Sequence, residues 1–174
     1  MHLGFSISVD TLDEFVRHWS ALYQYESEFK YSKNIGKPLT NQSRLELFEW
    51  KNGSVISRAK LKSIQTHYPL IFEGDIRERY LFPGKGGGAI WNIFYTHCLS
   101  PKVWPIFDQH VYRAMRYIQN GVILEIPKSE EEKFRVYRDE YIAFHASLGT
   151  FHDRKLDKAL FIFGKFLKTA KKYT

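Results

Sequence analysis

The segment LFPGKGGGAIW (residues 81–91) decides the fold, because it places four glycines and a proline between two apolar runs. Glycine adopts positive φ at no steric cost, so the chain can reverse direction sharply here. Shortly afterwards comes PIFDQHVYRAM (residues 105–115), in which Asp108 precedes apolar residues at helical spacing. An aspartate in that place is a typical N-cap. We therefore predict a helix, a tight glycine hairpin and a buried helix, followed by a third helix that begins after Asp108.

Outside this region, apolar residues recur with the spacing of amphipathic helices. Asp10, Thr40 and Ser129 stand where N-caps are expected. Residues 87–98 are apolar enough for a buried strand, but their length and the glycines in front of them favour a buried helix. The expected helices cover residues 11–26, 41–51, 57–67, 69–81, 87–98, 108–119, 130–147 and 154–171. We predict an all-α, two-lobed fold with a helix-hairpin-helix motif, in a single domain over residues 1–174.

Composition limits the classes of function. The 174 residues are 44% hydrophobic and 17% aromatic, which excludes an intrinsically disordered chain. The formal net charge of +7 favours a polyanionic partner, nucleic acid before an anionic membrane surface. Cys98 is the only cysteine, so neither an intramolecular disulfide nor a four-cysteine metal site can form. With no signal peptide and no apolar run of membrane-spanning length, we expect a cytoplasmic protein, nucleoid-associated if bacterial, without a membrane partner.

The glycine hairpin is a candidate phosphate-binding site. Backbone N–H groups at the start of a helix are unpaired, and the helix dipole favours an anion there. Residues Gly84, Gly86 and Gly88 remove side chains from the approach, and Lys85 adds a positive charge. Such a hairpin would grip a DNA backbone without reading its bases. The alternative is a glycine-rich tight turn in a helical protein, with no ligand.

These two segments together resemble the helix-hairpin-helix DNA glycosylases, the superfamily that includes endonuclease III. FPGKGGGAI (residues 82–90) is similar to the hairpin of that family. WPIFDQHVYRAM (residues 104–115) is similar to its second motif, a hydrophobic residue followed by Asp-x-His-Val-x-Arg. That second pattern is matched by Asp108, His110, Val111 and Arg113. The resemblance covers residues 76–118, and the flanking segments match only as generic helices.

The resemblance implies a fold, a partner and a catalytic residue. It implies an all-helical protein that binds double-stranded DNA, with Asp108 facing the sugar of the target nucleotide. In bifunctional members of the family a hairpin lysine attacks that sugar, but the matching position here is Gly88. The cysteine cluster of some members is also absent. The resemblance therefore implies a monofunctional glycosylase in which Asp108 assists hydrolysis, while an N-cap role alone remains the other interpretation of Asp108.

Excision of a base requires an aromatic pocket, because the nucleotide must leave the stack. We take Trp91, Tyr95 and Trp104 as candidates for this pocket, although most aromatic residues must belong to the core. We expect His110 to be a buried structural residue that faces away from Asp108. Arg113, in the same helix, is expected to bind phosphate or an acidic residue of a neighbouring helix. The basic residues of the last helix are expected to form a solvated face.

No metal site is expected, because the histidines lack the helical spacing of zinc ligands. No cofactor is expected either, and the hairpin leaves room for a monovalent cation. The sequence thus favours a monomeric DNA glycosylase of base excision repair that flips and excises a modified or mispaired base. The alternatives are a non-catalytic DNA-binding protein of the same fold and a helical protein-interaction module.

Overall fold

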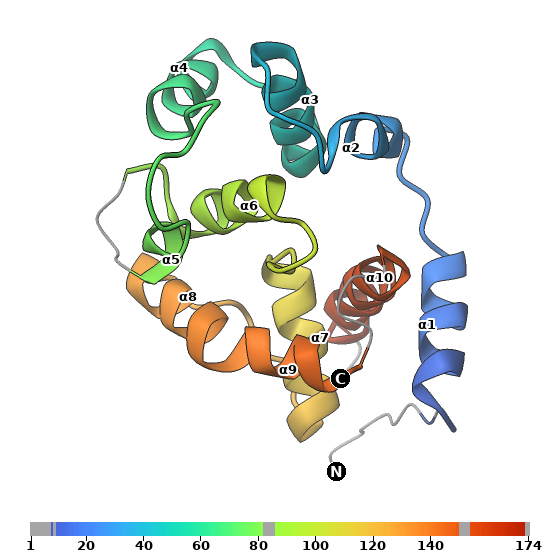
Figure 1. Cartoon of the computed structure of the whole chain (residues 1–174). Coiled ribbons are helices and arrows are strands. Elements are labelled where there is room, and N and C mark those ends of the chain that lie inside the picture. Colours follow the sequence, from blue (N-terminus) through green and yellow to red (C-terminus); the bar gives the residue numbers. More distant parts are fainter. Residues whose placement is uncertain (1–7, 9, 82–85, 150–153, 173–174) are drawn as a thin grey trace.

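The computed structural model describes residues 8, 10–81, 86–149 and 154–172, and every regular element among them is a helix. Figure 1 shows their arrangement. The helices are α1 (Leu12–Ala21), α2 (Glu28–Asn34), α3 (Asn41–Asn52), α4 (Arg58–His67), α5 (Glu78–Leu81), α6 (Ala89–Leu99), α7 (Gln109–Asn120), α8 (Glu130–Val136), the π-helical turn η1 (Tyr137–Tyr141), α9 (Ile142–Ser147) and α10 (Arg154–Ala170). The expected all-α class is confirmed. None of the described helices is long and apolar enough to cross a membrane.

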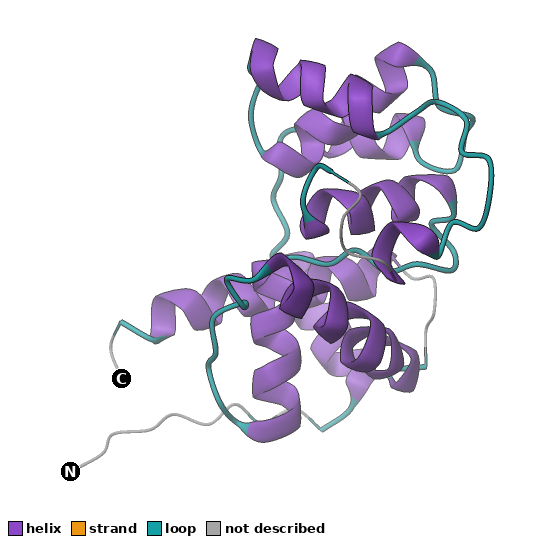
Figure 2. Ribbon diagram, turned by 90° about the vertical axis from the view of Figure 1, so that its left-hand side faces the viewer, coloured by secondary structure: helices purple, strands orange, loops and turns teal. Residues whose placement is uncertain are grey.

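Two hydrophobic cores organise these helices. One core is built by α1 and by the helices from α7 to α10, and the other by α2, α3 and α4. Helix α6 lies between them and contributes Ile93 to the first core and Phe94 to the second. A helix that is apolar on all sides is stable only when it is buried. Helix α6 is such a helix, and most of its residues are buried. Figure 2 shows the resulting upper and lower groups of helices.

Several element boundaries differ from those expected. The helix predicted over residues 11–26 ends at Ala21, and residues 28–34, for which no helix was predicted, form α2. Of the helix predicted over residues 69–81, only the short α5 forms. The first helix begins after Thr11, whose hydroxyl accepts the N–H of Glu14, so the assignment of Asp10 as its cap was wrong.

Other local predictions are confirmed. Thr40 caps α3 in a capping box with Ser43, and Ser129 caps α8 through the N–H of Glu132. The segment predicted as a buried helix over residues 87–98 forms α6 from Ala89 onward and not a strand. The segment predicted as one long helix over residues 130–147 is helical throughout, but it is interrupted by a π-helical turn at Tyr137–Tyr141. Such turns insert an extra residue into a helix and shift the faces on either side of it.

The backbones of helices α7 and α10 approach each other closely at Gly164. A Cβ atom at this position would lie 1.9 Å from the carbonyl oxygen of His110. The carbonyl oxygen of Gly164 in turn accepts a 3.0 Å hydrogen bond from the buried guanidinium of Arg113. The packing of the first core therefore requires a residue without a side chain in the middle of α10.

Replacement of Gly164 by alanine should strongly destabilise the protein, because the added methyl group collides with rigid backbone. We expect the free energy of unfolding to fall by about 3 kcal/mol or more, at the upper end of overpacking costs. Urea unfolding followed by circular dichroism measures this. The exposed neighbour Lys165→Ala is the matched control and should change stability little. Equal stability of both variants would contradict the close approach.

Candidate active site

The side chain of Asp108 is held at the start of α7 by three hydrogen bonds. Its Oδ1 atom accepts the backbone N–H groups of His110 and Val111 at 2.8 and 3.2 Å, which confirms the predicted N-cap. Its Oδ2 atom accepts a hydrogen bond from Nζ of Lys51 at 2.9 Å. Since Lys51 lies in the last turn of α3, the carboxylate connects the two groups of helices.

This environment keeps Asp108 ionised. Burial raises the pKa of its carboxyl group, but the nearby charges of Lys51 and His110 and the hydrogen bonds outweigh that effect, so the pKa falls below its ordinary value. The side chain is 17% exposed. Asp108 is thus a fixed carboxylate anion with limited access to solvent.

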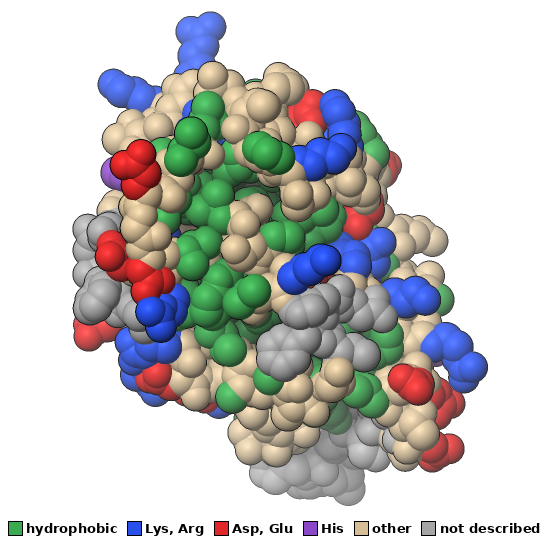
Figure 3. Space-filling view, in the orientation of Figure 1, with side chains coloured by type: hydrophobic (Ala, Val, Ile, Leu, Met, Phe, Trp, Pro, Cys, Tyr) green, Lys and Arg blue, Asp and Glu red, His purple; other side chains and the backbone are tan. Residues whose placement is uncertain are grey.

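Asp108 lies at the wall of a cavity of about 490 Å³ between the two groups of helices. Residues from both groups line it, including Lys51 from α3 and Ile126 from the segment before α8. The aromatic part of the lining consists of Tyr23, Tyr25, Trp50, Trp91 and Phe161. Figure 3 shows hydrophobic side chains in a hollow in the middle of one face of the molecule. The cavity therefore combines flat apolar walls with a carboxylate, which suits a planar ligand that carries a polar group.

Trp91 is the predicted pocket residue that the structure places in this cavity. Its ring stacks in parallel on Phe48, with centroids 5.2 Å apart and an interplanar angle of 5°. Nζ of Lys60 lies 4.9 Å from the centroid of the same ring. A ring fixed in this way can act as a platform for stacking.

The other two predicted pocket residues do not line the cavity. Tyr95 is fully buried in the second core, where its hydroxyl donates to the carbonyl of Pro69 at 2.6 Å. Trp104 packs against the first core with its ring 5.0 Å from Tyr80, and its carbonyl oxygen lies 2.6 Å from Nδ1 of His97. The contacts given for both residues lie within the protein, and their assignment to a base pocket stays a prediction.

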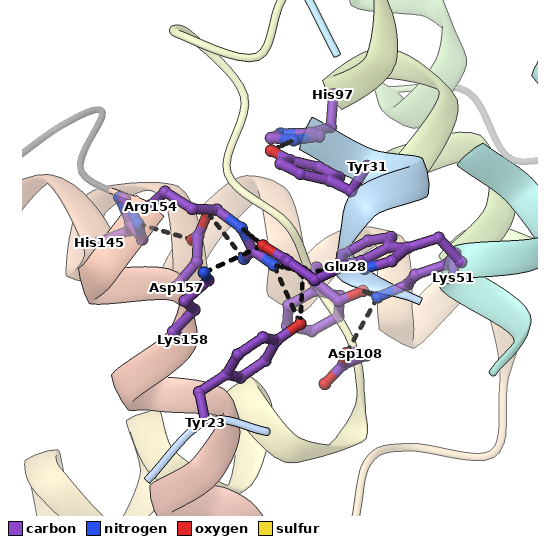
Figure 4. A network of polar contacts seen from close by, with 12 residues as sticks. Tyr23, Glu28, Tyr31, Lys51, His97, Asp108, His145, Arg154, Asp157 and Lys158 are labelled. Carbon is purple, nitrogen blue, oxygen red and sulfur yellow. Dashed lines mark hydrogen bonds and ion pairs between the residues drawn. The ribbon is translucent and has the colours of Figure 1, made fainter. Parts of the chain in front are cut away.

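Opposite Asp108, the carboxylate of Glu28 is the centre of a dense polar cluster (Figure 4). It accepts hydrogen bonds from Tyr23 at 2.7 Å and from the indole of Trp50 at 3.1 Å. Arg154 donates to both of its oxygens, and Nζ of Lys158 lies 3.1 Å away. Glu28 thereby joins α10 to α2 and α3 beside the cavity.

Arg154 corrects the expectation that the basic residues of the last helix form a solvated face. Its guanidinium lies 4.5 Å from the ring centroid of Tyr31 and 5.1 Å from that of Trp50. Cation–π contacts of this kind are strongest where water is excluded. A sequence pattern cannot reveal this, because Arg154 and its carboxylate partner Glu28 are 126 residues apart.

The described part of the glycine hairpin is packed against the protein. A Cβ atom at Gly86 would lie 2.4 Å from the imidazole of His67, and Gly88 has φ of 80° and begins α6. The N–H of Ala89, expected to be free for phosphate, donates to the carboxylate of Glu130. That expectation was therefore wrong for Ala89, because the carboxylate of Glu130 occupies the position at its N–H group where a phosphate was expected. Gly84 and Lys85 lie outside the described residues.

The remaining residues of the second motif have separate environments. Arg113 is fully buried and pairs with Glu125 at 2.7 Å, an acidic residue that lies in the segment between α7 and α8 and not, as expected, on a neighbouring helix. His110 lines the cavity, contrary to expectation, with its ring edge on Phe161 at 4.9 Å. Burial lowers the pKa of His110 below its ordinary value, although the charge of Asp108 opposes this effect.

The sequence reasoning missed Lys51, Arg154 and Glu28 as site residues. Lys51 stands in the sequence KNG that ends α3, where a lysine is ordinary because cations favour a helix C-terminus. Only the tertiary structure brings it to Asp108, 57 residues further along the chain.

No family model matches the chain, and searches of curated proteins and of solved structures found no significant match. Within the described ranges, no cluster of three or more histidine, cysteine, aspartate or glutamate side chains could hold a metal ion.

Replacement of Glu28 by glutamine tests the polar cluster, because it keeps an acceptor but removes the charge opposite Arg154 and Lys158. We expect the free energy of unfolding at pH 7 to fall by about 3 kcal/mol, as for a buried ion pair that loses one partner. The exposed Glu26→Gln serves as the control and should change stability little.

The loss of stability in Glu28→Gln should depend on pH. Burial raises the pKa of Glu28, but Arg154, Tyr23 and Lys158 bring it below its ordinary value of 4.5. A lowered folded-state pKa gives stability that is complete above the unfolded value and is lost as the pH falls through the folded value. The difference between the wild type and Glu28→Gln in urea unfolding should therefore shrink below pH 4.5. A constant difference at every pH would contradict this assignment.

Proposed function

We propose that the protein is a monofunctional DNA glycosylase that excises a modified or mispaired base and leaves an abasic site. The observation that carries this proposal is the ionised carboxylate of Asp108, fixed at the start of α7 in the wall of an aromatic cavity. The resemblance of residues 76–118 to helix-hairpin-helix glycosylases agrees with it.

The cavity supports the proposal through its size and lining. Its volume of about 490 Å³ lies in the range of small-molecule sites, roughly 300–1,000 Å³. A base that leaves the stack needs aromatic surfaces that replace its neighbours in the duplex. Trp91 and Trp50 offer such surfaces on the same cavity that Asp108 lines.

The chemistry requires an anion beside the sugar. When the N-glycosidic bond breaks, its electron pair leaves with the base, which takes up a proton, and positive charge develops on the sugar. A preorganised carboxylate stabilises that charge. Water then bonds to the sugar carbon and loses a proton. Because both oxygens of Asp108 already accept hydrogen bonds, electrostatic stabilisation is the role that its geometry favours over proton abstraction.

A second candidate function is a non-catalytic DNA-binding protein of the same fold. The observation that favours it is that Asp108 has complete structural roles, as the cap of α7 and as the partner of Lys51. The net charge of +7 agrees with DNA binding in either case.

Asp108→Asn separates the two functions, because asparagine keeps a capping oxygen but loses the negative charge. We propose to incubate the wild type with a panel of modified-base and mismatched duplexes and to reveal abasic sites with hot alkali. On a processed duplex, the variant should release the base at least about a hundredfold more slowly, a loss of roughly 3 kcal/mol of transition-state stabilisation.

The control for this experiment is the thermal unfolding of Asp108→Asn, which shows whether the variant remains folded. Unchanged base release by a folded variant would exclude Asp108 from catalysis. No release from any duplex by the wild type would favour the non-catalytic candidate.

DNA binding itself should depend steeply on salt, because lysine and arginine contacts with phosphates release counterions. We expect fluorescence anisotropy with a labelled duplex to show affinity falling by at least about tenfold between 50 and 200 mM salt. Binding should tolerate changes of sequence in undamaged duplexes. The absence of any binding at 50 mM salt would instead favour a helical protein-interaction module.

A further inference from the structure

We infer that Lys51 is the positioning residue for Asp108. It fixes the orientation of the Asp108 carboxylate at the wall of the cavity and keeps it ionised. The inference rests on the proposed function, which it deepens by naming a second residue of the site. Lys51 would act through Asp108 and not on the substrate.

The geometry of Lys51 is that of a clamp. Its side chain is only 7% exposed, and its Nζ atom lies 2.9 Å from Oδ2 of Asp108 and 3.2 Å from the carbonyl oxygen of Phe107. Both acceptors belong to consecutive residues at the point where the chain enters α7. The ammonium group therefore fixes the backbone as well as the carboxylate, and it lies 5.8 Å from the ring centroid of Phe94.

Other charged or titratable groups line the cavity or lie near Asp108, and three of them pair with other residues. They are His110 of α7, Lys133 of α8, Tyr141 of η1, and Arg154 and Asp157 of α10. Arg154 is bound by Glu28 and Lys133 by Glu130, while Asp157 lies 3.5 Å from His145. In the described part of the chain, Lys51 is the cation that contacts Asp108.

The ion pair opposes the effect of burial on Asp108. Burial alone raises the pKa of the carboxyl group, whereas the charge and hydrogen bond of Lys51 lower it. An opposite charge at this distance favours the ionised form of an aspartate and so lowers its pKa. Without Lys51, the carboxylate would take up a proton at a higher pH and would turn more freely about the two N–H groups of α7.

The same contact argues against Lys51 as a nucleophile. Attack on a sugar requires an amine whose nitrogen is free to bond to it. Nζ of Lys51 is engaged in hydrogen bonds to Oδ2 of Asp108 and to the carbonyl oxygen of Phe107, so it is placed to hold Asp108 and not to form a Schiff base.

The test compares wild type, Lys51→Met, Lys51→Arg and Lys51→Gln in two measurements. The first is a ¹³C NMR titration of the Asp108 carboxyl carbon, assigned with Asp108→Asn, which needs no substrate. The second is the rate of base release against pH on a duplex that the wild type processes. Lys30→Met is the matched control. Nζ of Lys30 lies 2.7 Å from the carboxylate of Glu49, and neither residue lines the cavity.

We expect Lys51→Met and Lys51→Gln to raise the titration midpoint of Asp108 and the acid limb of base release by at least about one pH unit. Lys51→Arg should restore both, and Lys30→Met should change neither. The two uncharged variants differ in shape, so the misfolding of one leaves the other to decide.

An unchanged midpoint in a folded, uncharged Lys51 variant would overturn the inference. So would a borohydride-trapped adduct of the wild type with DNA that Lys51→Arg abolishes, since that would make Lys51 the nucleophile. A wild type that releases no base refutes the proposed function alone, because the NMR titration still tests the clamp.

Discussion

The ion pair between Glu28 and Arg154 is the interaction on which the arrangement of this protein depends most. Donors from α3, α10 and the segment before α2 converge on the side chain of Glu28, which lies beside the cavity between the two groups of helices. An unpaired guanidinium among aromatic rings would be costly, and so would an unpaired carboxylate there. Each charge is therefore tolerable only because the other is present.

Asp108 is the second place where the cores are tied together, and it combines two demands. A cap must accept N–H groups from its own helix, and a catalytic anion must remain ionised while water is largely excluded. Both demands are met because Oδ1 is used within α7, while Oδ2 is paired with Lys51 of α3. Because each oxygen of Asp108 is hydrogen-bonded to a different group of helices, the orientation of the carboxylate is fixed. The structure and the proposed chemistry thus draw on the same hydrogen bonds.

The described glycines before α6, residues 86–88, have a structural reason that is independent of any ligand. Gly87 has φ of 100°, and its carbonyl accepts the hydroxyl of Tyr68 at 2.8 Å. A Cβ atom there would lie 2.1 Å from that hydroxyl oxygen. At the start of α6, the carboxylate of Glu130 provides the negative charge that a helix N-terminus favours. The described glycines are therefore explained by the close packing of α4 and α8 around the start of α6.

The sequence by itself determined the helical class, most of the helices and the cap at Asp108, because these depend on contacts within three or four residues. Periodicity and capping act locally, so Thr40, Ser129 and Asp108 could be recognised without a structure. Local rules were less reliable where tertiary packing competed with them, as at residues 69–77, which form no helix. Which residues line the cavity was decided by the tertiary structure alone. Lys51 meets Asp108 across 57 residues and Arg154 meets Glu28 across 126, and in the sequence each resembles an ordinary surface charge. Trp91 and Tyr95 lie one helical turn apart on α6, yet only Trp91 reaches the cavity, because the packing of neighbouring helices determines which part of a helix is left uncovered.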